Sequence, residues 1–127
     1  MEIQNQLAII AGSTLGMLAV IFGAFGAHAL KKRMSAELLV SFETGVRYQM
    51  YHALLLCFIS ILSLSDFTNL IVNLILIGTI LFSFSIYGLC LSATFGKKIK
   101  LFGPITPIGG LLLVGGWFML LYSFFVK

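Results

Sequence analysis

The feature that most constrains this chain is a series of apolar runs, each long enough to cross a lipid bilayer as a helix. The first run covers residues 7–30 without a single Asp, Glu, Lys or Arg, and three more cover residues 46–64, 70–95 and 105–126. A helix needs about 20 mainly apolar residues to cross the hydrocarbon core of a bilayer. The sequence therefore predicts an all-α integral membrane protein, a bundle of four transmembrane helices in a single domain over residues 1–127.

The overall composition supports a membrane environment and argues against a soluble protein. Hydrophobic residues make up 60% of the chain and charged residues only 9%, and the mean hydropathy is +1.10. Soluble domains carry about 25% charged residues, so this chain has too few polar side chains to cover a surface exposed to water. Membrane lipids are therefore its expected surroundings and its first expected partners.

Most of the basic residues lie in two short clusters, which set the expected topology. Six of the eight occur at residues 31–33 and 97–100, in the first and third connections, whereas the opposite side holds Glu2, Asp66 and Lys127. Because cytoplasmic loops carry an excess of Lys and Arg, we expect both clusters in the cytoplasm and both termini outside, in the cell membrane. The clusters are too short and too far apart to neutralise a nucleic-acid backbone, so no nucleic-acid partner is expected.

The segment at residues 34–45, between the first two spans, predicts a further short helix. Met34, Leu38 and Phe42 recur at every fourth residue and so share one helix face, and Ser35 is a suitable N-cap. This pattern favours a helix that lies in the membrane interface with its apolar face against lipid or against the bundle. The alternative is a structured loop.

Small residues recur along the predicted spans at a spacing that lets two helices approach closely. In lipid, helices associate through such close packing and through interhelical hydrogen bonds. Two interpretations stay open: packing within one bundle, or an interface with a second copy or with a partner membrane protein. The residues in question are Gly12, Gly16, Ala19, Gly23, Ala27, Gly78, Ser85, Gly88, Ser92, Gly109, Gly110, Gly115 and Gly116.

The first half of the second span carries an unusual group of polar side chains. At about 100° of rotation per residue, most of them fall on one helix face, and Glu43 and Arg47 have the spacing of a helical ion pair. His28 ends the first span on the same side of the membrane. The sequence predicts one inward-facing polar pocket, with Glu43 near its mouth. The predicted pocket residues are His28, Glu43, Thr44, Arg47, Tyr48, Tyr51 and His52.

Three interpretations of this polar group compete. It is a structural clasp between helices, a site for a small ligand, a lipid or a proton, or a catalytic or metal site. Two histidines with one carboxylate, Glu43, fall short of a zinc ligand set, and no nucleophile is paired with a base, so no catalytic residue, metal or cofactor is predicted. If the pocket exists, the His52 ring should lie within hydrogen-bond reach of a side chain or backbone group on another helix, or of a bound molecule.

Three segments of the chain resemble the signature segments of a known family. They are Gly-Ala-Phe-Gly-Ala-His at residues 23–28, the stretch 44–52 with its Tyr-Gln-Met-Tyr-His core, and Ile-Thr-Pro-Ile-Gly-Gly at residues 105–110. Together they resemble domain-of-unknown-function family 423, multi-pass membrane proteins with a eukaryotic relative called transmembrane protein 256. Ala29 stands where that family pattern has Gly, which affects only local packing.

The resemblance covers essentially the whole chain, and it implies four spans and a bacterial plasma-membrane location without supplying an activity, a substrate or a cofactor. With the missing catalytic set, the sequence favours a non-catalytic membrane module that binds lipid or a partner protein. The alternative is a small transporter or membrane enzyme that uses the polar pocket on the second span.

Overall fold

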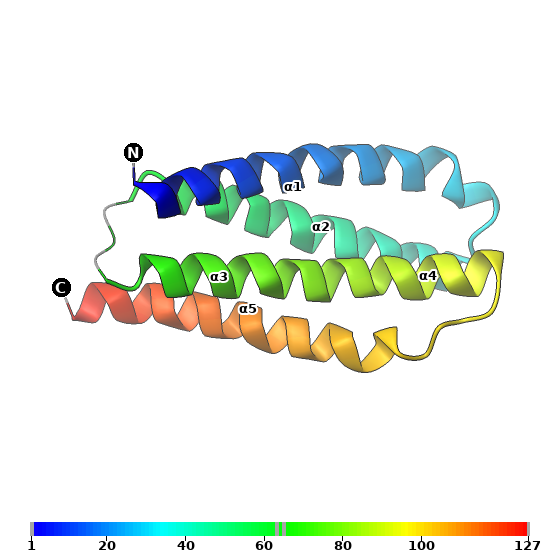
Figure 1. The fold of residues 1–127 in the computed structure, drawn as a ribbon. Helices are drawn as coiled ribbons and strands as arrows, with labels where there is room; N and C mark the ends of the chain where they lie inside the picture. The colour runs from blue at the N-terminus through cyan, green and yellow to red at the C-terminus, as the bar shows by residue number, and fades with distance from the viewer. Residues whose placement is uncertain (1, 63, 65, 127) are drawn as a thin grey trace.

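The protein is an all-helical bundle of long antiparallel helices (Figure 1). The computed structural model describes residues 2–62, 64 and 66–126, and this part of the chain contains no strand. The π-helical turn η2 joins α3 and α4 into one continuous rod, so four rods run side by side. The elements are α1 (Ile3–His28), the short 3-10 turn η1 (Leu30–Lys32), α2 (Ala36–Ile59), α3 (Thr68–Thr79), η2 (Ile80–Phe84), α4 (Ser85–Phe95) and α5 (Phe102–Phe125).

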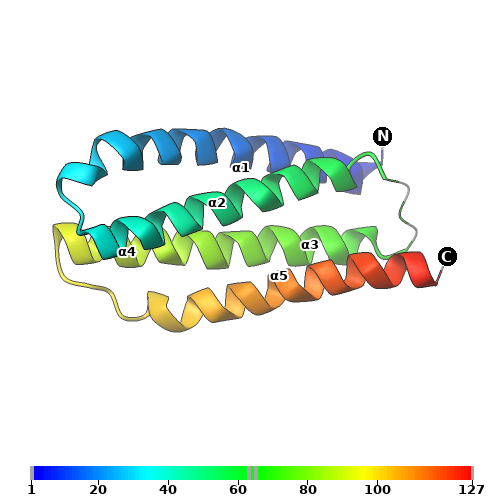
Figure 2. The same cartoon turned by 180° about the vertical axis from the view of Figure 1, so that it is seen from behind.

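The rods pack in two pairs, α1 with α2 and α3 with α5, and α2 also lies against the rod of α3 and α4 (Figures 1 and 2). Among the described residues, three stretches are long and apolar enough to cross a membrane: Ile3–Lys32, Thr68–Phe95 and Phe102–Phe125. Three of the four predicted spans are thus confirmed as long apolar helices. The fourth rod, α2, is as long as α5 but carries the polar group in its first half.

Both basic clusters lie at the same end of the bundle, which we call the basic end. The links at residues 29–35 and 96–101 meet there, whereas both termini lie at the opposite end (Figure 1). This is the charge separation between the two ends that the sequence predicts.

The predicted separate helix at residues 34–45 is wrong, because most of this segment forms the first turns of α2. Ser35 caps the start of α2 as predicted, and its Oγ accepts a hydrogen bond of 3.2 Å from the Leu38 amide. The helix then continues through Gly45 without a break. The apolar face was correctly identified, since Met34 and Phe42 are buried in a cluster between the helices at the basic end.

The small residues predicted at helix contacts pack within the chain. A Cβ at Gly12 would lie 2.8 Å from the Ala53 carbonyl oxygen, and one at Gly109 would overlap the backbone nitrogen of Phe82. These glycines therefore let α1 approach α2 and let α5 approach η2. They hold this bundle together, whether or not further copies associate with it.

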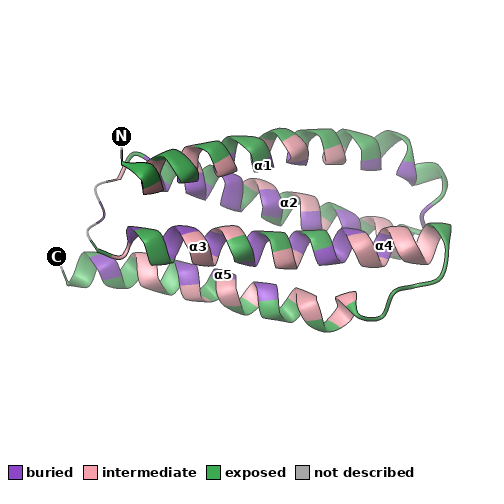
Figure 3. Cartoon of the chain, viewed as in Figure 1, coloured by how far each residue is buried: buried purple, intermediate pink, exposed green. Residues whose placement is uncertain are grey.

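Many residues on the outer side of the bundle are exposed (Figure 3), and a large number of them are hydrophobic. Large hydrophobic side chains such as Leu111 and Phe118 on α5 are 72% and 58% exposed, and Ile10 on α1 is 65% exposed. Exposing such a surface to water would cost free energy, whereas lipid tails are as apolar as these side chains and solvate them without that cost. The exposed side chains therefore agree with helices that sit in a bilayer.

Candidate functional site

The polar face of α2 is divided between the inside and the outside of the bundle. His52 is buried, with 5% of its surface exposed, but Tyr48 and Tyr51 are 40% and 53% exposed, and Arg47 is also exposed. The structure therefore does not gather the predicted residues in one inward-facing pocket. The polar residue at the centre of the buried face is Gln49, which is fully buried.

The rotation of α2 follows from where its small residues meet the neighbouring helices. Gly45 faces the Tyr87 ring of α4, and Ala53 faces Gly12 and Gly16 of α1. These two contacts allow close approach only if Gly45 and Ala53 point inward. The large side chains of Arg47 and Tyr51 then point outward, because they lie on the opposite part of the helix circumference.

His28 lies far from His52, the deepest residue of the predicted group. Gly26 of α1 packs on Phe42 of α2, and Gly16 packs on Ala53, which fixes the antiparallel register of the two helices. In this register His28 and His52 are separated by about 16 Å along the bundle axis, at about 1.5 Å per residue. The structure therefore does not bring His28 and His52 together in one pocket.

Glu43 and Arg47 are both exposed and form no ion pair with each other in the described part of the chain. The Arg47 guanidinium instead donates a hydrogen bond of 3.3 Å from Nη2 to the Thr44 hydroxyl oxygen. The spacing of a helical ion pair is thus present, but the two charges remain available to groups outside the chain.

His52 joins α2 to α5 through its ring, so the predicted partner on another helix is confirmed. The Trp117 indole Nε1 lies 3.1 Å from His52 Nε2, and His52 Nδ1 lies 2.7 Å from the carbonyl oxygen of Tyr48. An indole can only donate, so Nε2 is the acceptor, and Nδ1 carries the proton that it donates to Tyr48. Both ring nitrogens are therefore engaged, and the neutral ring has no free lone pair for a metal or a substrate.

Gln49 joins three helices through its side-chain amide, and sequence reasoning missed it. Its Nε2 donates to the Leu15 carbonyl oxygen of α1 at 2.7 Å, and its Oε1 accepts from the Tyr87 hydroxyl of α4 at 2.6 Å. A second bond runs beside it, from the Ser83 hydroxyl of η2 to the Gly45 carbonyl oxygen at 2.7 Å. The sequence does contain a signal for this role of Gln49. Gln49 is a polar residue about 100° around the helix from Tyr48, on the side of α2 where Gly45 and Ala53 contact the neighbouring helices.

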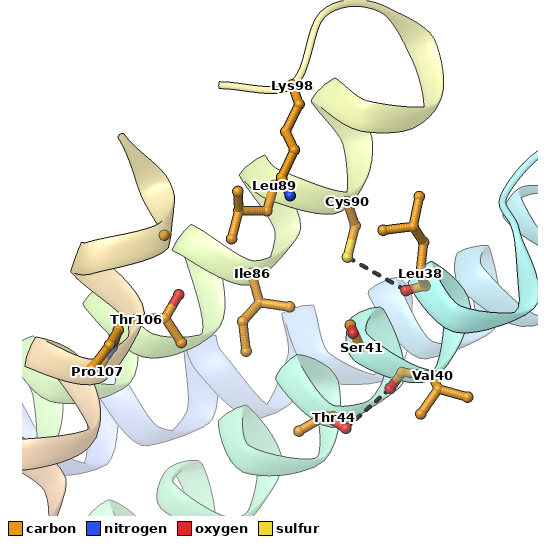
Figure 4. Close-up of a pocket in the computed structure, with 11 residues that line it drawn as sticks. Leu38, Val40, Ser41, Thr44, Ile86, Leu89, Cys90, Lys98, Thr106 and Pro107 are labelled. Atoms are coloured by element: carbon orange, nitrogen blue, oxygen red, sulfur yellow. Dashed lines mark hydrogen bonds between the residues drawn. The ribbon is translucent and has the colours of Figure 1, made fainter. Parts of the chain in front are cut away.

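A cavity of about 450 Å³ opens between α2, α4 and the start of α5 at the basic end (Figure 4). Thr44 is the predicted site residue that lines it, and Lys98 reaches into it from the link between α4 and α5. We call it the α2–α4–α5 cavity. Its lining residues are Leu38, Val40, Ser41, Thr44, Ile86, Leu89, Cys90, Lys98, Gly103, Thr106 and Pro107.

A smaller pocket of about 210 Å³ lies on the other side of α2, between α1 and the rod of α3 and α4. Aromatic rings form most of its lining, including Phe22, Phe42 and Tyr87. It contains no charged side chain and no unsatisfied polar group that would orient a ligand. The candidate site is therefore the α2–α4–α5 cavity.

The long apolar helices, the apolar outer surface and the interhelical hydrogen bonds define a small multi-pass membrane protein. The three signature segments lie at helix contacts or at the cavity: Gly26 against Phe42, Gly45 against Tyr87, and Thr106 in the cavity lining. The chain belongs to the family described as "Protein of unknown function (DUF423)", which matches residues 22–110 and so includes all three segments.

Relatives similar to this chain occur in bacteria and in yeast. A UPF0382 membrane protein of Staphylococcus haemolyticus is 42% identical over 124 residues, covering 94% of this chain and 96% of that protein. Another from Staphylococcus aureus is 44% identical with the same coverage. A UPF0382 membrane protein of Schizosaccharomyces pombe is 39% identical over 103 residues, covering 80% and 87% of the two chains. No solved structure matches the chain.

Proposed function

We propose that this protein is a non-catalytic module of the cell membrane that binds a membrane lipid in the α2–α4–α5 cavity. The observation that carries the proposal is the mixed lining of this cavity. Leu38, Ile86 and Leu89 provide an apolar wall, and Thr44 and Lys98 provide polar groups in the same space. An amphiphile needs both kinds of surface, and the cavity is partly open toward the outside of the bundle.

The state of the polar residues supports a binding role over a catalytic one. His52 uses both ring nitrogens in hydrogen bonds, and Gln49 uses its amide oxygen and nitrogen to join three helices. Groups that are engaged in this way stabilise the bundle and would have to break those bonds to take part in a reaction. The Lys98 ammonium group and the Ser41 hydroxyl have no partner in the described part of the chain, and both line the cavity at the basic end.

The depth of the cavity in the membrane supports a lipid as its ligand. We propose that α2 is the fourth span. From Arg47 to its end at Ile59 it rises by only about 18 Å, whereas a bilayer core is about 30 Å thick. Arg47 therefore lies inside the core, about 12 Å from its boundary at the basic end, and its long side chain extends toward the headgroups. The cavity lies between Arg47 and the basic end, at the depth of the headgroups and the upper acyl chains.

We further propose that the basic end faces the cytoplasm and that both termini lie outside, because six basic residues flank the spans at one end. The test uses a chain in which Cys57 and Cys90, both free thiols, are replaced by Ala. A cysteine in place of Lys100 should be protected from an impermeant thiol reagent in intact cells and should react after permeabilisation. A cysteine in place of Asp66 should react in both. Labelling of position 100 in intact cells would show that the basic end lies outside, and it would contradict the proposed orientation.

Filling the cavity should displace the lipid. A Cβ at Gly103 would meet no atom within 4 Å, and Gly103 lines the cavity, so Gly103→Leu should add an apolar side chain to the cavity lining. If the leucine excludes about two methylene groups of the lipid, the affinity should fall about tenfold. Native mass spectrometry of protein purified in mild detergent measures the fraction that retains a lipid.

The matched control is Gly115→Leu, at a glycine of the same helix that does not line the cavity and whose Cβ would make only an ordinary contact with Leu74 at 3.9 Å. This variant should retain lipid as the unmodified protein does. Equal retention by Gly103→Leu and Gly115→Leu would mean that the cavity is not a lipid site.

A further inference from the structure

We infer that the α2–α4–α5 cavity selects lipids whose headgroup carries an anionic phosphate, and that Lys98 is the residue that binds this phosphate. The inference rests on the proposed function and names the class of lipid. It starts from the charge of the cavity lining, which contains one basic side chain and no acidic one.

Lys98 is placed to bind a ligand inside the cavity. Its side chain extends from the link at residues 96–101 toward Leu89, so the ammonium group lies over the apolar wall (Figure 4). In the part of the chain that the structure describes, this ammonium group has no ion-pair or hydrogen-bond partner. A cation beside an apolar wall is stabilised by a counter-ion, because the wall solvates the charge poorly.

Arg47 provides a second cation at the inner rim of the cavity. Its Nη2 lies 3.3 Å from the hydroxyl oxygen of Thr44, and Thr44 lines the cavity. Because Arg47 forms no ion pair with Glu43, its guanidinium keeps donors available for a phosphate, which it can bind in a bidentate manner. The two cations thus border the cavity from two sides, Lys98 from the link after α4 and Arg47 from α2.

One hydroxyl group completes the polar part of the site. Thr44 donates its proton to the Val40 carbonyl oxygen at 3.0 Å, and Thr106 is bonded to Ser85 and Phe102. The Ser41 hydroxyl, in contrast, has no partner among the described residues and lines the cavity. It can donate to a phosphate oxygen that Lys98 attracts.

The apolar wall favours a lipid over a soluble phosphate. Leu38, Ile86, Leu89 and Pro107 line the same cavity as Lys98, and a free phosphate ion would leave these side chains uncovered. The glycerol backbone and first methylene groups of a phospholipid would cover them. The ligand class is therefore a phospholipid with net negative charge, such as phosphatidylglycerol.

The test compares two lipids with identical acyl chains, dioleoylphosphatidylglycerol and dioleoylphosphatidylcholine, offered together at equal concentration to the delipidated full-length protein in detergent. Native mass spectrometry gives the ratio of the two bound lipids. A basic residue near a membrane surface favours anionic lipid by about fivefold. We expect the unmodified protein to prefer phosphatidylglycerol, Lys98→Gln to lower the preference about fivefold, and Lys98→Gln with Arg47→Gln to remove it.

Lys100→Gln is the matched control, since it removes the same charge from the same link at a residue that does not line the cavity. It should leave the lipid ratio unchanged. An equal loss of preference in Lys100→Gln and Lys98→Gln would mean that only the overall charge matters, and it would overturn the role of Lys98.

The result also separates this inference from the proposed function. If the protein binds both lipids equally well and Gly103→Leu still displaces them, the cavity is a lipid site without headgroup selection, and the inference fails alone. If neither lipid is retained, the proposed function fails. Glycerol 3-phosphate, which has the same phosphate but no acyl chains, should not displace the lipid at equal concentration; displacement would point to a soluble phosphate ligand and overturn the inference.

Discussion

Replacing Gly109 by alanine should lower the free energy of unfolding by about 3 kcal/mol, the upper part of the range for overpacking a tight contact. A Cβ at this position would overlap the backbone nitrogen of Phe82 and lie 2.8 Å from the carbonyl carbon of Leu81. Backbone atoms inside a helix cannot rotate away as a side chain can, so α5 would have to move away from η2. Unfolding by a denaturing detergent in mixed micelles, followed by circular dichroism, measures the change.

Gly110→Ala is the control for this prediction. It makes the same substitution one residue further along α5, where the added Cβ would meet only the ring of Phe82 at 3.6 Å, an ordinary contact. Its free energy of unfolding should stay within about 0.5 kcal/mol of that of the unmodified protein. Similar values for the two variants would show that α5 does not contact η2 as closely as the structure indicates.

Replacing Gln49 by leucine should lower the free energy of unfolding by about 2 kcal/mol. The substitution keeps the approximate volume of the side chain but leaves the buried Tyr87 hydroxyl without its acceptor, which costs about 1–3 kcal/mol. It also removes the bond from Nε2 to the Leu15 carbonyl oxygen, which joins α2 to α1. The same detergent titration measures the effect.

A double-mutant cycle with Tyr87→Phe isolates the bond between the two side chains. Both partners are removed in the double variant, so its loss should be smaller than the sum of the single losses by about 1 kcal/mol. Asn73→Leu is the control for removing an amide from a span, because among the described residues the Asn73 side chain bonds only to Asn69 of its own helix, at 2.8 Å. It should be nearly neutral. A coupling energy of zero would contradict the bond between Gln49 and Tyr87.

The structural contacts and the proposed site occupy different parts of the bundle. Gln49, His52 and Gly109 hold the helices together around the middle of the bundle, and the cavity lies nearer the basic end. Variants of Lys98 should therefore change lipid selection without changing stability, and variants of Gln49 should do the opposite. The two groups of experiments can be interpreted separately for this reason.

The polar stretch at residues 44–52 shows where sequence reasoning was partly right. It correctly identified this stretch as the place where polar groups meet other helices, and His52 bonds to Trp117 as expected. It placed Arg47 and Tyr51 inside and overlooked Gln49, because it took the helix face with the most polar side chains as the inward face, and Gln49 lies outside that face. Helix rotation was decided instead by Gly45 and Ala53, whose small side chains allow close approach to α4 and α1.

The α2–α4–α5 cavity could not be predicted from the sequence, for a related reason. Its lining comes from three helices and one link, and Thr44 is its member among the pocket residues that the sequence predicted. Lys98 belongs to a cluster of similar lysines, and nothing in the local pattern separates it from Lys97 or Lys100. Only the path of the link between α4 and α5 brings Lys98, rather than its neighbours, into the cavity.

The sequence by itself determined that this is a helical membrane protein, where its long apolar helices run and that its basic clusters share one end. These properties depend on composition along single segments, because a chain in lipid must satisfy its backbone hydrogen bonds within each helix. The tertiary structure decided how α2 is rotated, which amide bridges three helices and which lysine enters the cavity. Those properties depend on the distances between atoms of different helices, and close approach at a few glycines sets these distances.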